Sequence, residues 1–181
     1  MTNGLVVMTP TSISVTGPGA ETATINADGS IAFVNAFVVS LNGIFTGDHD
    51  NYMISLRYND GIGHVYFRLR NSGSDESGTN YTIQYSDFNN TTLNKARTSA
   101  STYGYIGYCA TSNGGDASYL FKPYLAQPTA VRTVNVNAFN SARLTDQVSM
   151  HSLSTSYDGH SFGSFSSGEF SGLVTVFGFN Q

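Results

Sequence analysis

Hydrophobic and polar residues alternate along most of the chain, and this pattern predicts β-strands. The alternation is strictest in residues 52–58, 65–70 and 81–85, where every second side chain is large and apolar. A period of two places the two kinds of side chain on opposite faces of a strand. No window repeats apolar residues with the spacing of an amphipathic helix. Only the stretch Asp87–Thr102 leaves room for a single helical turn, around Leu93–Arg97.

Turn residues separate these alternating runs. The clearest turn is Ala27–Gly29, whose Asp-Gly pair suits a tight hairpin between Glu21–Asn26 and Ser30–Val34. Another run ends at the pair Asn42-Gly43. Turn signals recur about every 8 to 12 residues, which is the spacing of short strands in an all-β fold.

We therefore expect about twelve strands, joined mainly by antiparallel connections. The remaining ones are Leu5–Met8, Ser12–Thr16, Phe37–Leu41, Tyr103–Cys109, Ala117–Tyr124, Ala130–Ala138, Val148–Thr155, His160–Phe165 and Leu173–Phe179. The predicted fold class is all-β, an antiparallel β-sandwich of the jelly-roll kind. Because consecutive strands usually lie side by side, we expect the strands at 52–58 and 65–70 to pair as neighbours.

The length of 181 residues fits one domain of this class. We expect residues 21–181 to form a single β-sandwich. Two interpretations stay open for Met1–Ala20, which carries Pro10 and Pro18. The segment either belongs to the sandwich or forms an N-terminal arm that leaves its body.

Charge is scarce in this chain. Only 11% of the residues are charged, about half the usual share, and the net charge is −4. Uncharged polar groups desolvate more cheaply than ions, so a neighbouring subunit can cover such a surface at little cost. A surface rich in Ser and Thr that simply faces water has the same composition. The eight basic residues form no cluster, which disfavours nucleic acid as a partner.

The N-terminus MTNGLVVMTP has neither the basic region nor the long apolar region of a secretory signal. No apolar run approaches the roughly 20 residues that span a bilayer, so we expect no membrane partner. The sole cysteine, Cys109, excludes an internal disulfide, and its apolar surroundings suggest a small core residue. We expect the chain to be made and folded in a cytoplasm.

We expect no enzyme and assign no catalytic residue. The pattern G-x-S-x-G occurs at Gly159–Gly163, but inside a predicted strand and not at the strand-to-helix turn that a serine hydrolase of that type requires. The acidic residues lie mostly in turns, where Asp is favoured for its backbone geometry. They are Asp28, Asp60, Asp75, Glu76, Asp116 and Asp158. No pair of acids is placed for glycoside hydrolysis.

No metal site or cofactor site is predicted either. The run Asp48-His49-Asp50-Asn51 offers alternate oxygen ligands, but too few of them for calcium. The histidines His49, His64, His151 and His160 lack zinc-ligand spacing. A turn over Ser152–Gly159 would bring His151 and His160 together, but we favour a location on a polar sheet face.

Tyrosines and arginines are the remaining candidates for binding. The cluster Tyr103, Tyr105 and Tyr108 with Tyr119 and Tyr124 suits a sheet surface, a subunit contact or a carbohydrate platform. The strand at 65–70 has an apolar face and a second, cationic face. Arg57, Arg68 and Arg70 either contact a partner or line a solvated face, and the second case is the commoner one.

Several stretches resemble a group of small virion proteins of tailed bacteriophages, often cyanophages or other marine phages. They occur in order along almost the whole chain. The stretches are GLVVMTPTS (4–12), VSLNGIFTGDHDNYMISLR (39–57), FRLRNSGSDESGTNY (67–81), PYLAQPT (123–129), STSYDG (154–159) and FSGLVTVFGF (170–179). Phe177 and Phe179 stand where relatives tend to have Tyr. The resemblance implies a structural component of a virion and carries over no catalytic residue.

Two functions are compatible with these expectations, and we favour the first. The first is a head decoration or cement protein, a homotrimer that binds the major capsid protein and stabilises the shell, with Met1–Ala20 as its attachment element. The second is a receptor-binding tail fibre or knob domain that recognises host-surface carbohydrate through tyrosines and loop amides. Hundreds of copies in each particle would indicate the first function, and about a dozen the second.

Overall fold

Sixteen strands build the part of the chain that the structure, a computed structural model, describes. The described residues are 4–59, 63–89, 91–109, 114–123, 130–137, 143–165 and 168–180, and at 89, 108, 109, 130–137 and 143 only the backbone is described. All strand pairs are antiparallel, and the strands form two sheets. The predicted class, an all-β antiparallel sandwich, is confirmed.

The larger sheet has the strand order β10-β9-β14-β13-β12-β6-β16-β4-β3, and β1 also pairs with β16. Its strands are β1 (Val6–Met8), β3 (Thr22–Ile25), β4 (Ile31–Ala36), β6 (Asn51–Asn59), β9 (Tyr81–Asn89), β10 (Thr92–Ser101), β12 (Gly115–Phe121), β13 (Ala130–Asn137), β14 (Arg143–His151) and β16 (Phe170–Phe179). We call it the large sheet.

The smaller sheet has the order β11-β7-β15-β5-β2, and the short β8 pairs with β7. Its strands are β2 (Ser12–Thr16), β5 (Val38–Asn42), β7 (Gly63–Asn71), β8 (Ser74–Asp75), β11 (Gly104–Cys109) and β15 (Gly159–Ser164). We call it the small sheet. Within the described residues there is no helix that could cross a membrane.

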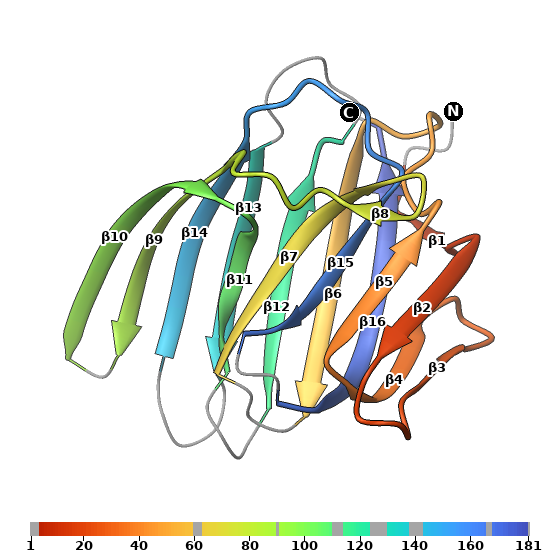
Figure 1. Ribbon diagram of the computed structural model, residues 1–181, viewed down its shortest axis with the longest axis horizontal. Coiled ribbons are helices and arrows are strands. Elements are labelled where there is room, and N and C mark those ends of the chain that lie inside the picture. The colour runs from red at the N-terminus through yellow and green to blue at the C-terminus, as the bar shows by residue number, and fades with distance from the viewer. Residues whose placement is uncertain are drawn as a thin grey trace.

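The large sheet extends beyond the small one at one side. The edge strand β11 of the small sheet packs over β13 and β14, so β9 and β10 project past it. Figure 1 shows this step at the left, where β10 and β9 stand clear of the front layer. β11 still contacts β9, where Tyr81 and Ile83 are buried, but the side chains of β10 before Ser101 are exposed, and this difference in width positions the candidate site.

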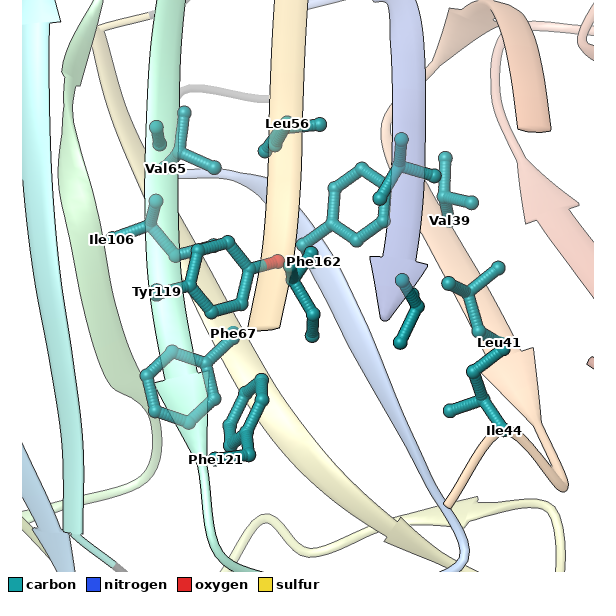
Figure 2. Close-up of a cluster of buried hydrophobic side chains, with 14 of the residues drawn as sticks. Val39, Leu41, Ile44, Leu56, Val65, Phe67, Ile106, Tyr119, Phe121 and Phe162 are labelled. Carbon is teal, nitrogen blue, oxygen red and sulfur yellow. The ribbon is translucent and has the colours of Figure 1, made fainter. Parts of the chain in front are cut away.

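Apolar side chains from both sheets fill the space between them. Figure 2 shows Phe67, Phe162 and Val39 of the small sheet beside Tyr119 and Leu56 of the large one, all at most 1% exposed. The phenylalanine rings meet edge to face, as for Phe33 and Phe162 at 5.5 Å between centroids. Such pairs are favoured over face-to-face stacking because of the ring quadrupole. This aromatic interior fixes how the two sheets lie on each other.

The predicted Asp-Gly hairpin is confirmed between β3 and β4. Gly29 has a φ of 81°, a backbone conformation that glycine adopts without strain. The Asp28 carboxylate accepts hydrogen bonds from the Ser30 amide at 2.9 Å and the Ser30 hydroxyl at 2.6 Å. Asn26 N–H donates to the Ser30 carbonyl and closes the turn. The predicted strand end at Asn42 is also confirmed.

The expectation that the strands at 52–58 and 65–70 pair is wrong. The first, β6, pairs with β12 and β16 in the large sheet, whereas the second, β7, pairs with β11 and β15 in the small sheet. Both strands have one apolar face, and these faces lie toward each other across the core. Each strand alternates because it buries one face between the layers. The alternation therefore does not show which strands are neighbours in a sheet.

The predicted helical turn around Leu93–Arg97 is also wrong, because these residues lie in the middle of β10. This strand pairs with β9 from Thr92 opposite Asn89 onward. Its side chains are exposed at every position except Ser101. A strand without a buried face shows no alternation of apolar and polar residues. Its backbone hydrogen bonds come from the pairing with β9.

The described part of the first twenty residues lies against the sandwich. β1 pairs with β16 of the large sheet, and β2 pairs with β5 of the small sheet. Ile13 and Val15 of β2 are half-buried and pack against the core. This segment therefore contributes a strand to each layer.

Candidate functional site: an aromatic hollow beside β11

A hollow of about 330 Å³ lies where the small sheet ends and the large sheet continues. Its lining comes from β7, β9, β10 and β11, from Tyr103 just before β11 and from the residue after β15. Its volume falls within the range of small-molecule sites, about 300–1,000 Å³. The lining residues are His64, Ile83, Tyr85, Thr98, Tyr103, Tyr105 and Phe165.

Aromatic rings form a continuous ribbon through the hollow. Tyr85 lies 5.7 Å from Tyr105 between ring centroids, and the Tyr105 ring lies 5.3 Å from that of His64. Phe165 lies 6.3 Å from His64 and 4.4 Å from Tyr103. Each ring thus contacts the next, and neighbouring rings hold each other in place. The result is a largely pre-formed apolar surface.

Polar atoms are few and fixed within this surface. The Tyr105 hydroxyl and His64 Nδ1 are 2.5 Å apart, so one of them donates a hydrogen bond to the other. The Tyr105 amide donates to the Ser149 hydroxyl of β14 at 3.3 Å, which anchors β11 on the large sheet. Thr98 adds a hydroxyl from β10. A few placed polar groups among apolar walls is the usual composition of a small-molecule site.

The sequence of β7 explains why its polar and aromatic side chains reach the outer surface. Val65, Phe67 and Leu69 are at most 1% exposed and lie in the core. Side chains alternate along a strand, so His64 and Tyr66 lie on the opposite face. The predicted two-faced character of this strand is confirmed.

The arginines of β7 occupy the same outer face next to the hollow. The Arg68 guanidinium lies 5.2 Å from the centroid of the Tyr66 ring, and its Nε donates to the Thr102 carbonyl at 3.0 Å. Tyr66 in turn contacts Phe165 at 5.0 Å between centroids. The aromatic ribbon therefore continues from the hollow to a cation.

Arg70 is buried and has partners on all sides, in contrast to the solvated arginine that we regarded as the commoner case. Its guanidinium forms an ion pair with Asp75 of β8 and donates to Asn42 Oδ1 at 2.8 Å and to Ser40 Oγ at 3.0 Å. Ser161 Oγ donates to the same carboxylate at 3.0 Å. Arg57, by contrast, forms an exposed pair with Asp116 on the large sheet.

Two histidines are buried between the layers, and the predicted location on a polar sheet face is wrong for His160. His160 is fully buried and stacks between Phe45 and Phe162. Burial lowers its pKa to about 3, helped by the nearby charge of Arg70. Burial also lowers the pKa of His151, whose ring contacts Tyr81 and Tyr157 instead. The two imidazoles thus have separate sets of neighbours. His160 lies among apolar rings, whereas His151 shares the inner face of β14 with the buried polar residues Gln147 and Ser149.

The run Asp48–Asn51 forms a loop that leads into β6. The Asp50 amide donates to Asn180 Oδ1 at 2.9 Å, and Asn180 Nδ2 donates to the Asp48 carbonyl at 3.1 Å. The Asp48 carboxylate accepts from Thr46 Oγ1 at 3.2 Å. Across the described ranges, no three His, Cys, Asp or Glu side chains come together as a metal site.

The structure separates the tyrosines that the sequence grouped. Tyr103 and Tyr105 line the hollow, whereas Tyr119 is 1% exposed in the core. Tyr124 and the side chains of Tyr108 and Cys109 lie outside what the structure describes.

Sequence reasoning did not select Tyr85 or Phe165 as site residues. No local sequence pattern marks them. They come from different sheets and line the same hollow only because the small sheet ends at β11.

A second exposed feature lies on the outer face of the large sheet. Leu93 of β10, Phe88 of β9 and Leu144 of β14 are neighbours in register across three strands. They are 51%, 44% and 37% exposed. We call these three residues the outer apolar row. It faces away from the small sheet, because the residues that alternate with them, such as Asp87 and Thr145, are buried.

Comparison with known proteins finds no matching family model and no matching curated protein. Among solved structures, the chain is similar to a mutant of the alginate lyase Aly36B in complex with alginate tetrasaccharide, with a TM-score of 0.33 and 9% identity over 96% of this chain and 93% of that one. It is also similar to the catalytic domain of PdAgaC, with a TM-score of 0.24 and 10% identity over 98% and 76%.

A third similar structure is the botulinum neurotoxin serotype G binding domain, with a TM-score of 0.26 and 8% identity. The match covers 98% of this chain and 44% of that one. At these TM-scores, none of the three carries an inference about binding or catalysis.

Proposed function

We propose that this chain is a non-catalytic, carbohydrate-binding domain of a bacteriophage particle, of the receptor-binding kind. The observation that carries the proposal is the aromatic hollow beside β11, with its ribbon of contacting rings. The assignment to a particle rests on the resemblance of the sequence to virion proteins, and the ligand class rests on the chemistry of the hollow.

Sugars have one face of C–H groups and a rim of hydroxyls. Tyr103 and Phe165 offer ring faces to the first, and Phe165 remains 39% exposed. The hydroxyls of Tyr105 and Thr98 and the imidazole of His64 offer hydrogen bonds to the second. Tyrosine suits this role because its ring is apolar while its hydroxyl stays polar. Only 11% of the residues are charged, so charge repulsion from the rest of the chain does little to oppose a neutral or acidic glycan.

Binding to an immobilised panel of neutral and acidic oligosaccharides tests the proposal. We expect the wild-type chain to bind a subset of the panel and Phe165→Ala to weaken this binding about tenfold, since the variant removes an exposed ring. The matched control is Phe88→Ala, which removes a similarly exposed ring from the outer apolar row. Equal effects of the two variants, or no binding to any glycan, would contradict the proposal.

The non-catalytic part of the proposal has its own readout. After long incubation with the bound oligosaccharide, mass spectrometry should recover the ligand with its mass unchanged. Shortened products that depend on the wild-type chain would show turnover and would reject this part while leaving binding intact.

A second candidate function is supported by the outer apolar row. In this case the chain is a head decoration protein that docks on the capsid through the face of the large sheet that carries Phe88. Stable interfaces have an apolar, weakly charged centre, and three large exposed apolar side chains in register provide one. Phe88→Ser should then abolish co-sedimentation with phage heads that lack the protein, whereas Phe165→Ala should not. Loss of co-sedimentation in Phe165→Ala but not in Phe88→Ser would reject the decoration role.

A further inference from the structure

The aromatic ribbon of the hollow ends at a cation whose hydrogen-bonding capacity is only partly used. Arg68 Nε donates to the Thr102 carbonyl at 3.0 Å. Its Nη1 lies 3.8 Å from Asp75 Oδ2, which is too long for a hydrogen bond. Within the described part of the chain, no further hydrogen bond is made by its terminal nitrogens, and the side chain is 27% exposed.

The surroundings of Arg68 leave it a net positive charge. Arg68 and Arg70 share a single carboxylate, that of Asp75. Asp75 is committed to Arg70, with which it forms the closer pair, and it also accepts a hydrogen bond from Ser161 at 3.0 Å. Three charges therefore sum to one positive charge on the outer face of β7. This local charge is opposite in sign to the net charge of the chain, −4.

The position of Arg68 relative to the hollow is set by Tyr66. This ring contacts both walls of the hollow, Phe165 at 5.0 Å and Tyr103 at 5.9 Å between centroids. The Arg68 guanidinium lies 5.2 Å from the centroid of the same ring. The cation thus lies one ring beyond the hollow.

We infer that the site recognises an acidic oligosaccharide of at least two sugar units, with one pyranose ring against Phe165 and Tyr103 and the carboxylate or sulfate of the adjacent unit on the Arg68 guanidinium. This inference rests on the proposed carbohydrate-binding function and specifies its ligand. A guanidinium is suited to the task because its planar set of donors matches the oxygens of a carboxylate or sulfate.

The test uses pairs of ligands that differ only in charge. An oligogalacturonide is compared with its methyl ester, and a sulfated galactan oligosaccharide with its desulfated form. We expect the wild-type chain to bind at least one acidic member about tenfold more tightly than its neutral counterpart. The preferred pair tells carboxylate from sulfate. Added salt should weaken binding of the acidic member and leave the neutral one unchanged.

Arg68→Gln should remove this preference, so that acidic and neutral members bind alike, while neutral binding falls less than twofold. Retained neutral binding shows that the variant is folded. The matched control is Arg57→Gln, which makes the same change of charge at the exposed Arg57–Asp116 pair of the large sheet. It should leave the preference for acidic ligands intact.

Three further results would overturn the inference. Equal binding of charged and neutral members by the wild-type chain would reject the role of Arg68 and leave the carbohydrate-binding function standing. Binding of neither member of either pair would reject both. An equal loss of the preference in Arg57→Gln and Arg68→Gln would also reject it, because the effect would then come from net charge.

Discussion

His160 Nε2 lies 3.3 Å from the hydroxyl of Tyr119 in the centre of the core, and the two side chains come from different sheets. Both residues are at most 1% exposed. Burial opposes charge on either of them, so it lowers the pKa of His160 to about 3 and raises that of Tyr119 well above its ordinary value. The pair is thus neutral across the whole physiological range.

This pair makes the stability of the fold depend on pH. Unfolded His160 takes up a proton near its ordinary pKa of 6.5, whereas the folded state resists protonation down to about pH 3. The unfolded state therefore binds more protons between these values, and stability falls as the pH is lowered through this window. From pH 7 to pH 4 the loss from His160 alone is about 3 kcal/mol. Denaturant unfolding at the two pH values measures it.

Replacing the imidazole should remove most of this pH dependence. His160→Leu loses the hydrogen bond to Tyr119 at every pH, so its stability is lower at pH 7 but changes less between pH 7 and pH 4. His151, whose pKa is also lowered, leaves a smaller slope of the same sign. An unchanged slope in His160→Leu would show that burial of this histidine is not its origin.

Gly104 packs directly on the ring of Phe67, its partner in register between β11 and β7. A Cβ at this position would overlap that ring, which is 1% exposed and held in the core. Gly104→Ala should therefore cost about 1–3 kcal/mol of unfolding free energy. Gly47→Ala is the control, since a Cβ there meets no atom within 4 Å. Urea titrations that give equal midpoints for the two variants would contradict this packing.

The buried ion pair between Arg70 and Asp75 should be far more sensitive than the exposed one between Arg57 and Asp116. The side chains are 9% and 23% exposed in the first pair and 72% and 58% in the second. Asp75→Asn leaves a buried guanidinium without its counter-charge and should cost about 3 kcal/mol or more. Asp116→Asn should change stability by less than about 1 kcal/mol. Thermal unfolding of both variants checks this order, and a reversed order would disprove it.

The sequence allowed us to predict the strands with a buried face, such as β6 and β7, because alternation is visible only when one face packs against a core. It did not reveal which of these strands share a sheet. β10 was missed for the same physical reason, since all its residues before Ser101 are exposed. Its partner β9 determines its conformation, and pairing between strands leaves little trace in a single sequence.

The candidate site was only partly visible. Tyr103 and Tyr105 were among the tyrosines that we selected, and the outward face of β7 was correctly assigned to His64 and Arg68. Phe165 and its neighbours meet at a step between two sheets of unequal width. That step depends on which strands of the large sheet β11 covers, and the alternation of apolar and polar residues does not reveal it.

The central claim is that the hollow beside β11 binds sugar rings, and aromatic carbon-detected NMR titration with the oligosaccharides of the panel tests it most directly. The ring signals of Tyr103 and Phe165 should shift on addition of a bound ligand, while those of Phe88 on the outer face and Tyr119 in the core stay in place. Shifts confined to Phe88, or no shift of the Tyr103 and Phe165 rings with any ligand that binds, would contradict the account.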